Sequence, residues 1–191
     1  MKAFSAAKLR LAPVLDAATR AHLARQLASV VVGAAGGLPV LVVCDDDEVA
    51  RWATQLGARV VWTPGRGLDG AVADGVVAAG AAGAARAIVA HADLPLARDL
   101  GRLGTHLPGA VVLVPDRHLD GTNVAVVPTA AGFRFAYGAG SFARHVAEAG
   151  RLGLELAVLD EPTLAWDVDV PADLDHLAVA TLLGRPPATC P

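Results

Sequence analysis

Three aspartates follow or interrupt segments that have the character of buried strands. Asp93 comes after the apolar run 87–90, and Asp167 and Asp169 alternate in the segment Trp166-Asp-Val-Asp169. Because successive side chains of an extended segment point to opposite sides, Asp167 and Asp169 are expected on the same side. Two carboxylates on one face repel each other unless a cation lies between them, and Mg²⁺ prefers carboxylates together with substrate phosphates. The aspartates therefore predict a magnesium site, although Asp93 taken alone could equally cap a helix that begins near residue 97.

The only lysines of the chain lie close together at its start. Lys2 and Lys8 precede Arg10 in the segment Lys2-Ala-Phe-Ser-Ala-Ala-Lys-Leu-Arg10, whereas arginine stands at every other strongly basic position. Ammonium groups act as compact positive charges on phosphate oxygens. We therefore expect Lys2, Lys8 and Arg10 to bind the phosphates of a nucleoside triphosphate.

A glycine-rich segment, Gly65-Arg-Gly-Leu-Asp-Gly70, follows a predicted strand and opens a predicted helix. Its spacing matches the fingerprint of dinucleotide-binding folds. NAD binding is disfavoured, because Thr63-Pro64 precedes the turn, the motif lies in the third strand-helix unit, and Asp93 is followed by Leu-Pro rather than by a ribose-binding context. Two interpretations remain, an ordinary turn or a mononucleotide loop in which Gly65 and Gly67 let a base or ribose approach the backbone.

A second glycine-rich segment, Gly138-Ala-Gly-Ser-Phe-Ala-Arg-His145, leads into a helix predicted to start at Ser141. Free backbone N–H groups at a helix start can face an anion. Thr122, in the polar turn Asp120-Gly-Thr-Asn123, could donate its hydroxyl to the same anion. The pattern predicts a cradle for a phosphate or carboxylate, and the alternative is a simple turn followed by an N-cap serine.

Short apolar strands alternating with helices must position these residues. This alternation predicts strand-helix-strand units and a parallel sheet that is covered by helices on both faces. Ligands of such sheets bind at the carboxyl ends of the strands, where the polar segments above are found. The predicted strands span 40–44, 59–62, 87–90 and 110–114, and the predicted helices span 16–35, 46–56, 68–82 and 97–106.

After residue 115 the pattern changes, and strands of mixed direction are expected. The 191 residues are 54% hydrophobic and only 4% aromatic, which predicts one domain, residues 1–184, with an aliphatic core. A frayed tail is expected over residues 185–191. The further predicted elements are a hairpin of 123–127 with 133–135, a helix over 141–149, a strand over 154–159 and a closing helix over 171–183.

Composition excludes several classes of function. The net charge of −3 and the lack of a basic block argue against nucleic-acid binding. The longest uncharged stretch, 27–43, is interrupted by Gly36, Gly37 and Pro39, which argues against a membrane span. The N-terminal segment lacks the apolar core of a signal peptide, so a cytoplasmic enzyme is expected. Cys44 and Cys190 form no metal motif or disulfide framework and are expected as free thiols. The oligomeric state is open, with a homodimer among the alternatives.

Taken together, these segments resemble the small guanylyltransferases that make the guanylylated precursor of coenzyme F420, acting on 2-phospho-L-lactate or phosphoenolpyruvate. The resemblance covers nearly the whole chain. It implies a three-layer α/β nucleotidyltransferase fold of Rossmann type, with a mixed, mostly parallel sheet between helices. The segments that carry it are Lys2 with 7–13, 65–69, 92–96, 116–123, Phe133-Arg-Phe135 with 138–145, and Asp167-Val-Asp169 with Pro171, the last two being the most specific.

The resemblance also implies the reaction and the residues that perform it. The acid's phosphate oxygen would attack the α-phosphorus of GTP, with Mg²⁺ as cofactor and pyrophosphate as the leaving group. The implied roles are metal binding by Asp93, Asp167 and Asp169, acid binding by Thr122, Gly138 and Ser141, nucleotide binding by Lys2, Lys8, Arg10, Gly65, Gly67 and Asp69, and catalysis by Lys8 and Asp93.

The chain departs from the family pattern in two places. Family members usually begin with an apolar strand before the lysine loop, but here Met1 directly precedes Lys2, so the first strand of the sheet is expected to be missing. Asp69 stands where the family often has asparagine. Phosphoenolpyruvate is the expected acceptor, with 2-phospho-L-lactate and 3-phosphoglycerate as alternatives. Transfer to a sugar phosphate or molybdopterin, or a non-catalytic nucleotide-binding module, remain alternative functions.

Overall fold

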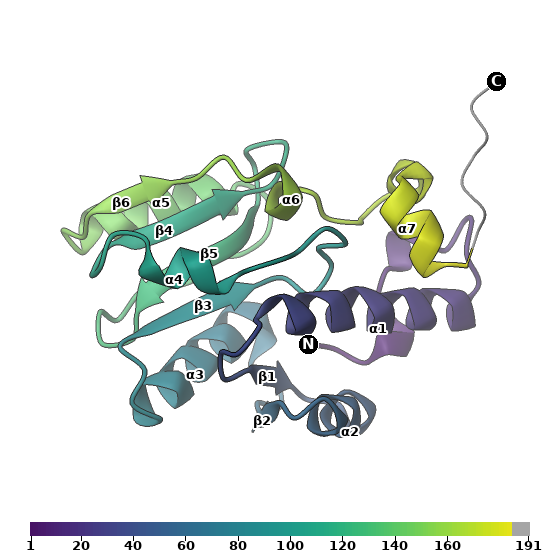
Figure 1. Cartoon of the computed structure of the whole chain (residues 1–191), viewed down its shortest axis with the longest axis horizontal. Coiled ribbons are helices and arrows are strands. Elements are labelled where there is room, and N and C mark those ends of the chain that lie inside the picture. Colours follow the sequence, from purple (N-terminus) through teal and green to yellow (C-terminus); the bar gives the residue numbers. More distant parts are fainter. Residues whose placement is uncertain (185–191) are drawn as a thin grey trace.

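The structure of the chain, a computed structural model, describes residues 1–184. The expected frayed tail, 185–191, and Cys190 lie outside the described residues, while Cys44 is buried and free. Strands and helices alternate through the first half of the chain, as predicted (Figure 1). The strands are β1 (Leu41–Cys44), β2 (Arg59–Trp62), β3 (Arg86–Ala90), β4 (Val111–Pro115), β5 (Thr122–Pro128) and β6 (Leu156–Val158).

Helices connect these strands, and short 3-10 turns precede the first helix and the last one. Asp16 caps the longest helix by accepting a hydrogen bond from the backbone N–H of Thr19 at 2.7 Å. The α-helices are α1 (Ala17–Ala34), α2 (Asp47–Gln55), α3 (Gly67–Ala81), α4 (Gly101–Thr105), α5 (Ser141–Arg151), α6 (Pro162–Ala165) and α7 (Leu177–Leu182), and the 3-10 turns are Phe4–Ala6, Leu9–Leu11 and Pro171–Asp175.

The strands form two sheets with mixed pairing. β1 pairs in parallel with β2, and a four-stranded sheet has the order β3-β5-β4-β6. In the larger sheet β5 runs antiparallel to both β3 and β4, whereas β4 and β6 are parallel. The mixed sheet is thus confirmed, with one of its three pairings parallel, and the single pairing of the smaller sheet is parallel as well.

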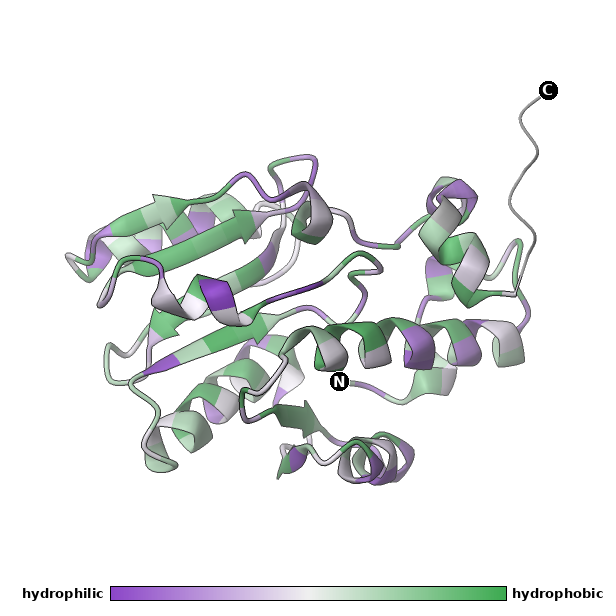
Figure 2. Cartoon of the chain, in the orientation of Figure 1, coloured by the Kyte–Doolittle hydropathy of each residue, from purple (hydrophilic) through white to green (hydrophobic). Residues whose placement is uncertain are grey.

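Helices cover the larger sheet on both faces, which confirms the three-layer α/β architecture. Alternate residues of β4 face opposite layers, so Val112 and Val114 pack with α1, α4 and α6, while Val111 and Leu113 pack with α3 and α5. Figure 2 shows the resulting hydrophobic character of the central strands. All five residues of β4 are buried. The core is aliphatic here, as the composition predicts.

Within residues 1–184, no strand joins the smaller sheet to the larger one. β1 pairs only with β2 and β3 only with β5, although α3 packs against both β1 and β3. The backbone amino group of Met1 donates a hydrogen bond to the carbonyl of Val43 in β1. Within the described residues, the smaller sheet thus consists of β1 and β2 alone.

Three sequence predictions were wrong. Residues 133–135 form no strand, and β5 pairs with β3 and β4 instead of a hairpin partner. The helix predicted over 97–106 is confined to α4, because Asp99 adopts a left-handed backbone conformation (φ 46°). The predicted closing helix is interrupted at His176, whose extended backbone (ψ 130°) separates the last 3-10 turn from α7. No helix among residues 1–184 has the length and apolar composition of a membrane span.

Candidate active site

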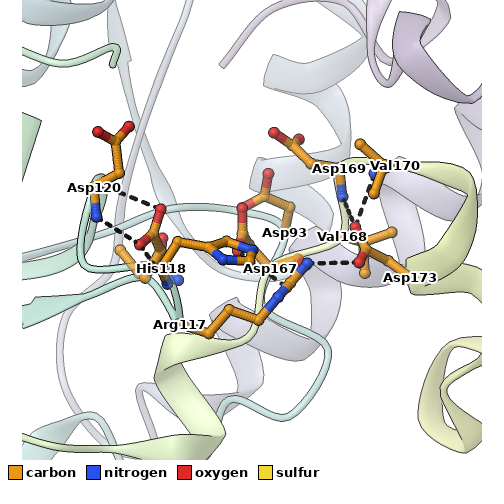
Figure 3. Close-up of polar contacts among 12 residues, drawn as sticks. Asp93, Arg117, His118, Asp120, Asp167, Val168, Asp169, Val170 and Asp173 are labelled. Atoms are coloured by element: carbon orange, nitrogen blue, oxygen red, sulfur yellow. Dashed lines mark hydrogen bonds and ion pairs between the residues drawn. The ribbon is translucent and has the colours of Figure 1, made fainter. Parts of the chain in front are cut away.

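Asp93 lies just beyond the carboxyl end of β3, where the sheet geometry predicts chemistry. The backbone carbonyl of Asp93 accepts a hydrogen bond from the N–H of Val168 at 3.2 Å, which ties the loop after β3 to the segment between α6 and the last 3-10 turn. This contact between residues 75 positions apart in the chain brings Asp93 close to Asp167 and Asp169 (Figure 3). The three aspartates therefore lie in one region and interact electrostatically, although their side chains do not form a cluster that could hold a metal ion within residues 1–184.

The Lys8 ammonium group lies among these acidic groups. Its Nζ atom is 2.5 Å from Oδ2 of Asp93, 3.4 Å from Oδ1 of Asp169 and 2.5 Å from the carbonyl oxygen of Val168. Burial disfavours the charged ammonium, but the charges and hydrogen bonds of Asp93 and Asp169 outweigh it and raise the pKa of Lys8. Arg10 adds a second cation, 2.9 Å from Oδ2 of Asp169. The lysine and arginine expected at the triphosphate thus lie at the carboxylates.

The electrostatics of the two deeper carboxylates differ in direction. Burial raises the pKa of Asp93, but Lys8 and then His91 outweigh it, so its pKa is lowered overall. Burial also raises the pKa of Asp167, and the negative charges of Asp93 and Asp169 raise it further. The ionised form of Asp93 is therefore favoured, whereas that of Asp167 is disfavoured, although the Arg117 guanidinium, 3.5 Å from Oδ1 of Asp167, opposes this rise in pKa.

Arg117 holds the loop that carries Asp167. Its guanidinium lies 2.6 Å from Asp173 and donates to the carbonyl of Asp167 at 2.9 Å (Figure 3). It also lies over the Trp166 ring, 4.3 Å from the ring centroid. Asp173 in turn accepts backbone hydrogen bonds from Asp169 and Val170. The sequence analysis assigned no role to Arg117 or Asp173, because an arginine in a turn and an acid after Pro171 carry no distinguishing pattern.

The residues present fit a divalent cation only in part. One buried oxygen of Asp93, Oδ1, has no hydrogen-bond partner, which is unusual for a carboxylate and leaves an acceptor available. Among residues 1–184, however, no three acidic, histidine or cysteine side chains converge as a ready metal site. Lys8 lies between Asp93 and Asp169, the position at which a cation shared by these two carboxylates would have to lie.

The first glycine-rich segment forms the start of α3. Gly65 and Gly67 have positive φ values of 70° and 64°, which L side chains rarely adopt, so the turn requires glycine. Arg66, between these glycines, forms an ion pair with Asp74 of α3 at 2.8 Å. Asp69 accepts a hydrogen bond from the backbone N–H of Tyr137 at 2.8 Å, so it anchors the loop before α5. This anchoring role of the aspartate was not anticipated.

The residues of the predicted anion cradle lie at the start of β5 and around the start of α5. The backbone N–H of Thr122 donates to the Ser141 hydroxyl at 3.1 Å, and both side chains are buried. Gly138 and Gly140 precede Ser141 with positive φ values of 97° and 71°. His145, one turn further along α5, contacts the Thr122 hydroxyl at 3.0 Å. No role was predicted for His145 from the sequence, although it ends the glycine-rich motif 138–145.

Aromatic contacts join the cradle to the carboxylates. The His91 ring, two residues before Asp93, lies 5.1 Å from the Tyr137 ring, which immediately precedes Gly138. Lys2 differs from the other expected residues, since its side chain is exposed and makes no hydrogen bond or ion pair within residues 1–184. The structure therefore brings the acid-binding and metal-binding candidates to one edge of the sheet, and Asp69 ties the glycine turn to the same edge through Tyr137.

Matches to guanylyltransferases over most of the chain define its class as a nucleotidyltransferase. A solved structure from Desulfovibrio desulfuricans, provisionally named a nucleotide-diphospho-sugar transferase, shares the fold with a TM-score of 0.75, 17% identity, and coverage of 96% of this chain and 94% of that chain. The model of the family described as "Guanylyl transferase CofC like" matches residues 1–181. The chain belongs to this family of guanylyltransferases.

Named relatives support this membership. The chain is 38% identical to the phosphoenolpyruvate guanylyltransferase of Sphaerobacter thermophilus, over 91% of this chain and 87% of the relative. It is 36% identical to the enzyme of the same name from Rubrobacter xylanophilus, with coverage of 93% and 90%. It is 32% identical to the 2-phospho-L-lactate guanylyltransferase of Methanothermobacter thermautotrophicus, with coverage of 91% and 79%.

Proposed function

We propose that this chain transfers GMP from GTP to a three-carbon phospho-acid and releases pyrophosphate, as a step in coenzyme F420 biosynthesis. Phosphoenolpyruvate is the favoured acceptor, because the bacterial relatives named above carry that substrate in their names. 2-Phospho-L-lactate is the next candidate, from the archaeal relative. We assign the activity to a single domain formed by residues 1–184.

One observation carries the proposal, namely the position of the carboxylate and cation cluster beside the hydroxyl cradle. Ion pairs with Asp93 and Asp169 hold Lys8 and Arg10 together, which supports the proposal that these two cations meet the triphosphate there. The buried hydroxyls of Thr122 and Ser141 form the cradle. The contact between the rings of His91 and Tyr137 joins this cradle to the cluster. A nucleotide and an anionic acceptor can therefore bind next to each other.

The residues divide between the two substrates. Lys8 and Arg10 would pair with phosphate oxygens of GTP, with the exposed Lys2 as a further cation. Gly65 and Gly67 would let the nucleoside approach the backbone. The acid would be held by its phosphate and carboxylate in the cradle. Its residues are Thr122, Gly138 and Ser141.

We assign Mg²⁺ as the cofactor, held by Asp93, Asp167 and Asp169 together with substrate phosphates. The bound ion would neutralise charge on the triphosphate and the leaving pyrophosphate. In the reaction a bond forms between the acid's phosphate oxygen and the α-phosphorus, and the bond to pyrophosphate breaks. The attacking oxygen is already ionised at neutral pH, so no residue has to remove a proton. As the proposed catalytic residues, Lys8 would place positive charge at the reacting phosphates and Asp93 would hold the cation that does the same.

The test is to measure pyrophosphate release by the purified chain with GTP and Mg²⁺. Phosphoenolpyruvate, 2-phospho-L-lactate and 3-phosphoglycerate are supplied separately, with a sugar phosphate as a further acceptor and ATP as the alternative nucleotide. We expect release with GTP and phosphoenolpyruvate, and the guanylylated acid as product. Release with the sugar phosphate alone, or no release with any acceptor, would contradict the proposal.

A further inference from the structure

His145 is a completely buried polar side chain next to the proposed acid site. It lies on α5 with 0% exposure, among the rings of Phe133, Phe135 and Tyr137 at centroid distances of 5.8, 5.9 and 5.0 Å. Both ring nitrogens have partners. The backbone N–H of Ala136 donates to Nε2 at 3.0 Å, and Nδ1 lies 3.0 Å from the Thr122 hydroxyl oxygen.

These two contacts determine which nitrogen carries the proton. Nε2 accepts a hydrogen bond from a backbone N–H group that can only donate, so Nε2 must be unprotonated. A neutral imidazole with a free Nε2 carries its hydrogen on Nδ1. His145 therefore donates through Nδ1 to the Thr122 oxygen, which becomes the acceptor in this contact.

The hydroxyl hydrogens of Thr122 and Ser141 consequently have no acceptor among the described residues. Thr122 already accepts from His145, and the hydroxyl oxygen of Ser141 already accepts from the backbone N–H of Thr122. Neither hydroxyl donates to a described residue. An anion has only acceptors to offer, so two hydroxyls that can still donate are complementary to it.

We propose that His145 is a positioning residue that orients the Thr122 hydroxyl as a donor to the anionic group of the acid substrate. This inference rests on the proposed function, because it assigns the cradle to that acid. His145 does not act as a general base, since its only unprotonated nitrogen is occupied by the Ala136 N–H group. Its effect on the reaction passes through Thr122.

Two substitutions separate the two hydrogen bonds of His145. The amide nitrogen of asparagine occupies the place of Nδ1, so His145→Asn keeps a donor for Thr122. The longer glutamine side chain reaches the place of Nε2, so His145→Gln keeps an acceptor for Ala136 but loses the donor to Thr122. We expect His145→Gln to raise KM for the acid about tenfold with kcat changed less than about twofold, as for a lost ground-state contact, and His145→Asn to restore most of that KM.

A double-mutant cycle with Thr122 distinguishes positioning from general support of the core. Thr122→Val removes the hydroxyl and Thr122→Ser, the matched control, keeps it. In the Thr122→Val background, His145→Gln should change KM for the acid less than about twofold, because its target is already gone. KM for GTP should stay near the wild-type value throughout. Independent and additive effects, or equal losses in KM for both substrates, would overturn the positioning role.

A second measurement does not depend on turnover or on a folded variant. Nitrogen-15 NMR of the wild-type imidazole should show an unprotonated Nε2 and a protonated Nδ1 at neutral pH, and a protonated Nε2 would overturn the inference. The two proposals fail in different ways. A wild type that releases pyrophosphate while the cycle is additive removes only the positioning role. A wild type inactive with every phospho-acid removes the proposed function, and the role of the cradle with it.

Discussion

Lys8 adopts a backbone conformation that lysine seldom takes. Its φ of 55° is in the left-handed region, which costs a residue with a side chain about 1 kcal/mol. Nζ of Lys8 makes contacts with Asp93, Val168 and Asp169 that offset this cost. The Lys8 side chain therefore contributes both to the conformation of the N-terminal turn and to the charge at the site.

Asp93→Asn tests the charge of the central carboxylate with almost no change in shape. We expect pyrophosphate release to fall by about a hundredfold or more, because both Lys8 and any bound cation lose their shared negative partner. Asp99→Asn is the matched control, since Asp99 is exposed nearby and asparagine tolerates its left-handed backbone. Circular dichroism should show both variants folded. Activity within a fewfold of wild type in Asp93→Asn would contradict its catalytic assignment.

His145 makes stability depend on pH. Its pKa is lowered to about 4, first by burial and then by Arg144, with His91 adding and Asp69 and Glu148 opposing. The unfolded chain binds a proton near pH 6.5 and the folded chain only near pH 4, so stability falls as the pH falls through this window. The loss attributable to His145 is about 3 kcal/mol.

Urea unfolding at pH 6.5, 5.5 and 4.5 measures this contribution. The free energy of unfolding of wild type should fall more steeply than that of His145→Gln, which has no imidazole to protonate. His22→Gln, at an exposed position of α1, should retain the wild-type slope. Equal slopes for wild type and His145→Gln would show that His145 does not resist protonation in the fold.

Part of the site could be predicted from residue types and spacing. Asp93 follows β3 as expected, and its association with Asp167 and Asp169 could be predicted from residue types, but Asp167 and Asp169 lie in a loop that reaches Asp93 through the Val168 N–H group rather than at the end of a neighbouring strand. Lys8 was assigned to a triphosphate, and its place between two carboxylates depends on a contact between residues 161 positions apart in the chain. His145 carried no signal, because a single histidine in a helix has the same sequence appearance whether or not it has partners.

The strands show where local pattern is sufficient. Apolar runs located β1, β2, β3 and β4 to within a residue or two, since a buried strand requires such a run. Which strands pair with one another could not be predicted from the local sequence pattern. Phe133 and Phe135 have the composition of a strand, but their rings pack into the core beside His145 while the edges of β5 are already paired with β3 and β4.

Helix α3 packs unusually close to β1 at Gly75. A Cβ atom at this position would lie 2.6 Å from a methyl group of Val43, closer than real contacts allow. Alanine in a helix interior normally stabilises, but here we expect Gly75→Ala to lower the free energy of unfolding by about 1 to 2 kcal/mol, through overpacking. Denaturant unfolding measures the change.

Two controls show whether overpacking is the cause. Gly33→Ala on α1 has nothing within 4 Å of its new methyl group and should stabilise by about 0.5 to 1 kcal/mol. Adding Val43→Ala to Gly75→Ala removes the clashing methyl group, so the combined loss should be smaller than the sum of the two separate losses. Strict additivity would mean that α3 and β1 separate without cost.

Across the whole molecule, the division of the sheet predicts unequal stability. β4 and β5 are buried and each is paired with a strand on both sides, whereas β1 is paired with a strand, β2, along only one edge within residues 1–184. A two-stranded sheet is marginally stable without further packing. Backbone amides of β1 and β2 should therefore exchange with deuterium about tenfold or more faster than those of β4 and β5. Uniform protection across both sheets would contradict this prediction.

The chain contains a single tyrosine, Tyr137, and the fold places it at the edge of the cradle. Its ring stacks on Phe135 with an interplanar angle of 2°, and burial raises its pKa. The phenol therefore stays protonated in alkaline buffer for as long as this part of the molecule remains closed. Tyrosinate absorbance consequently provides a native optical signal for the opening of one defined region, with no label and no contribution from elsewhere in the chain.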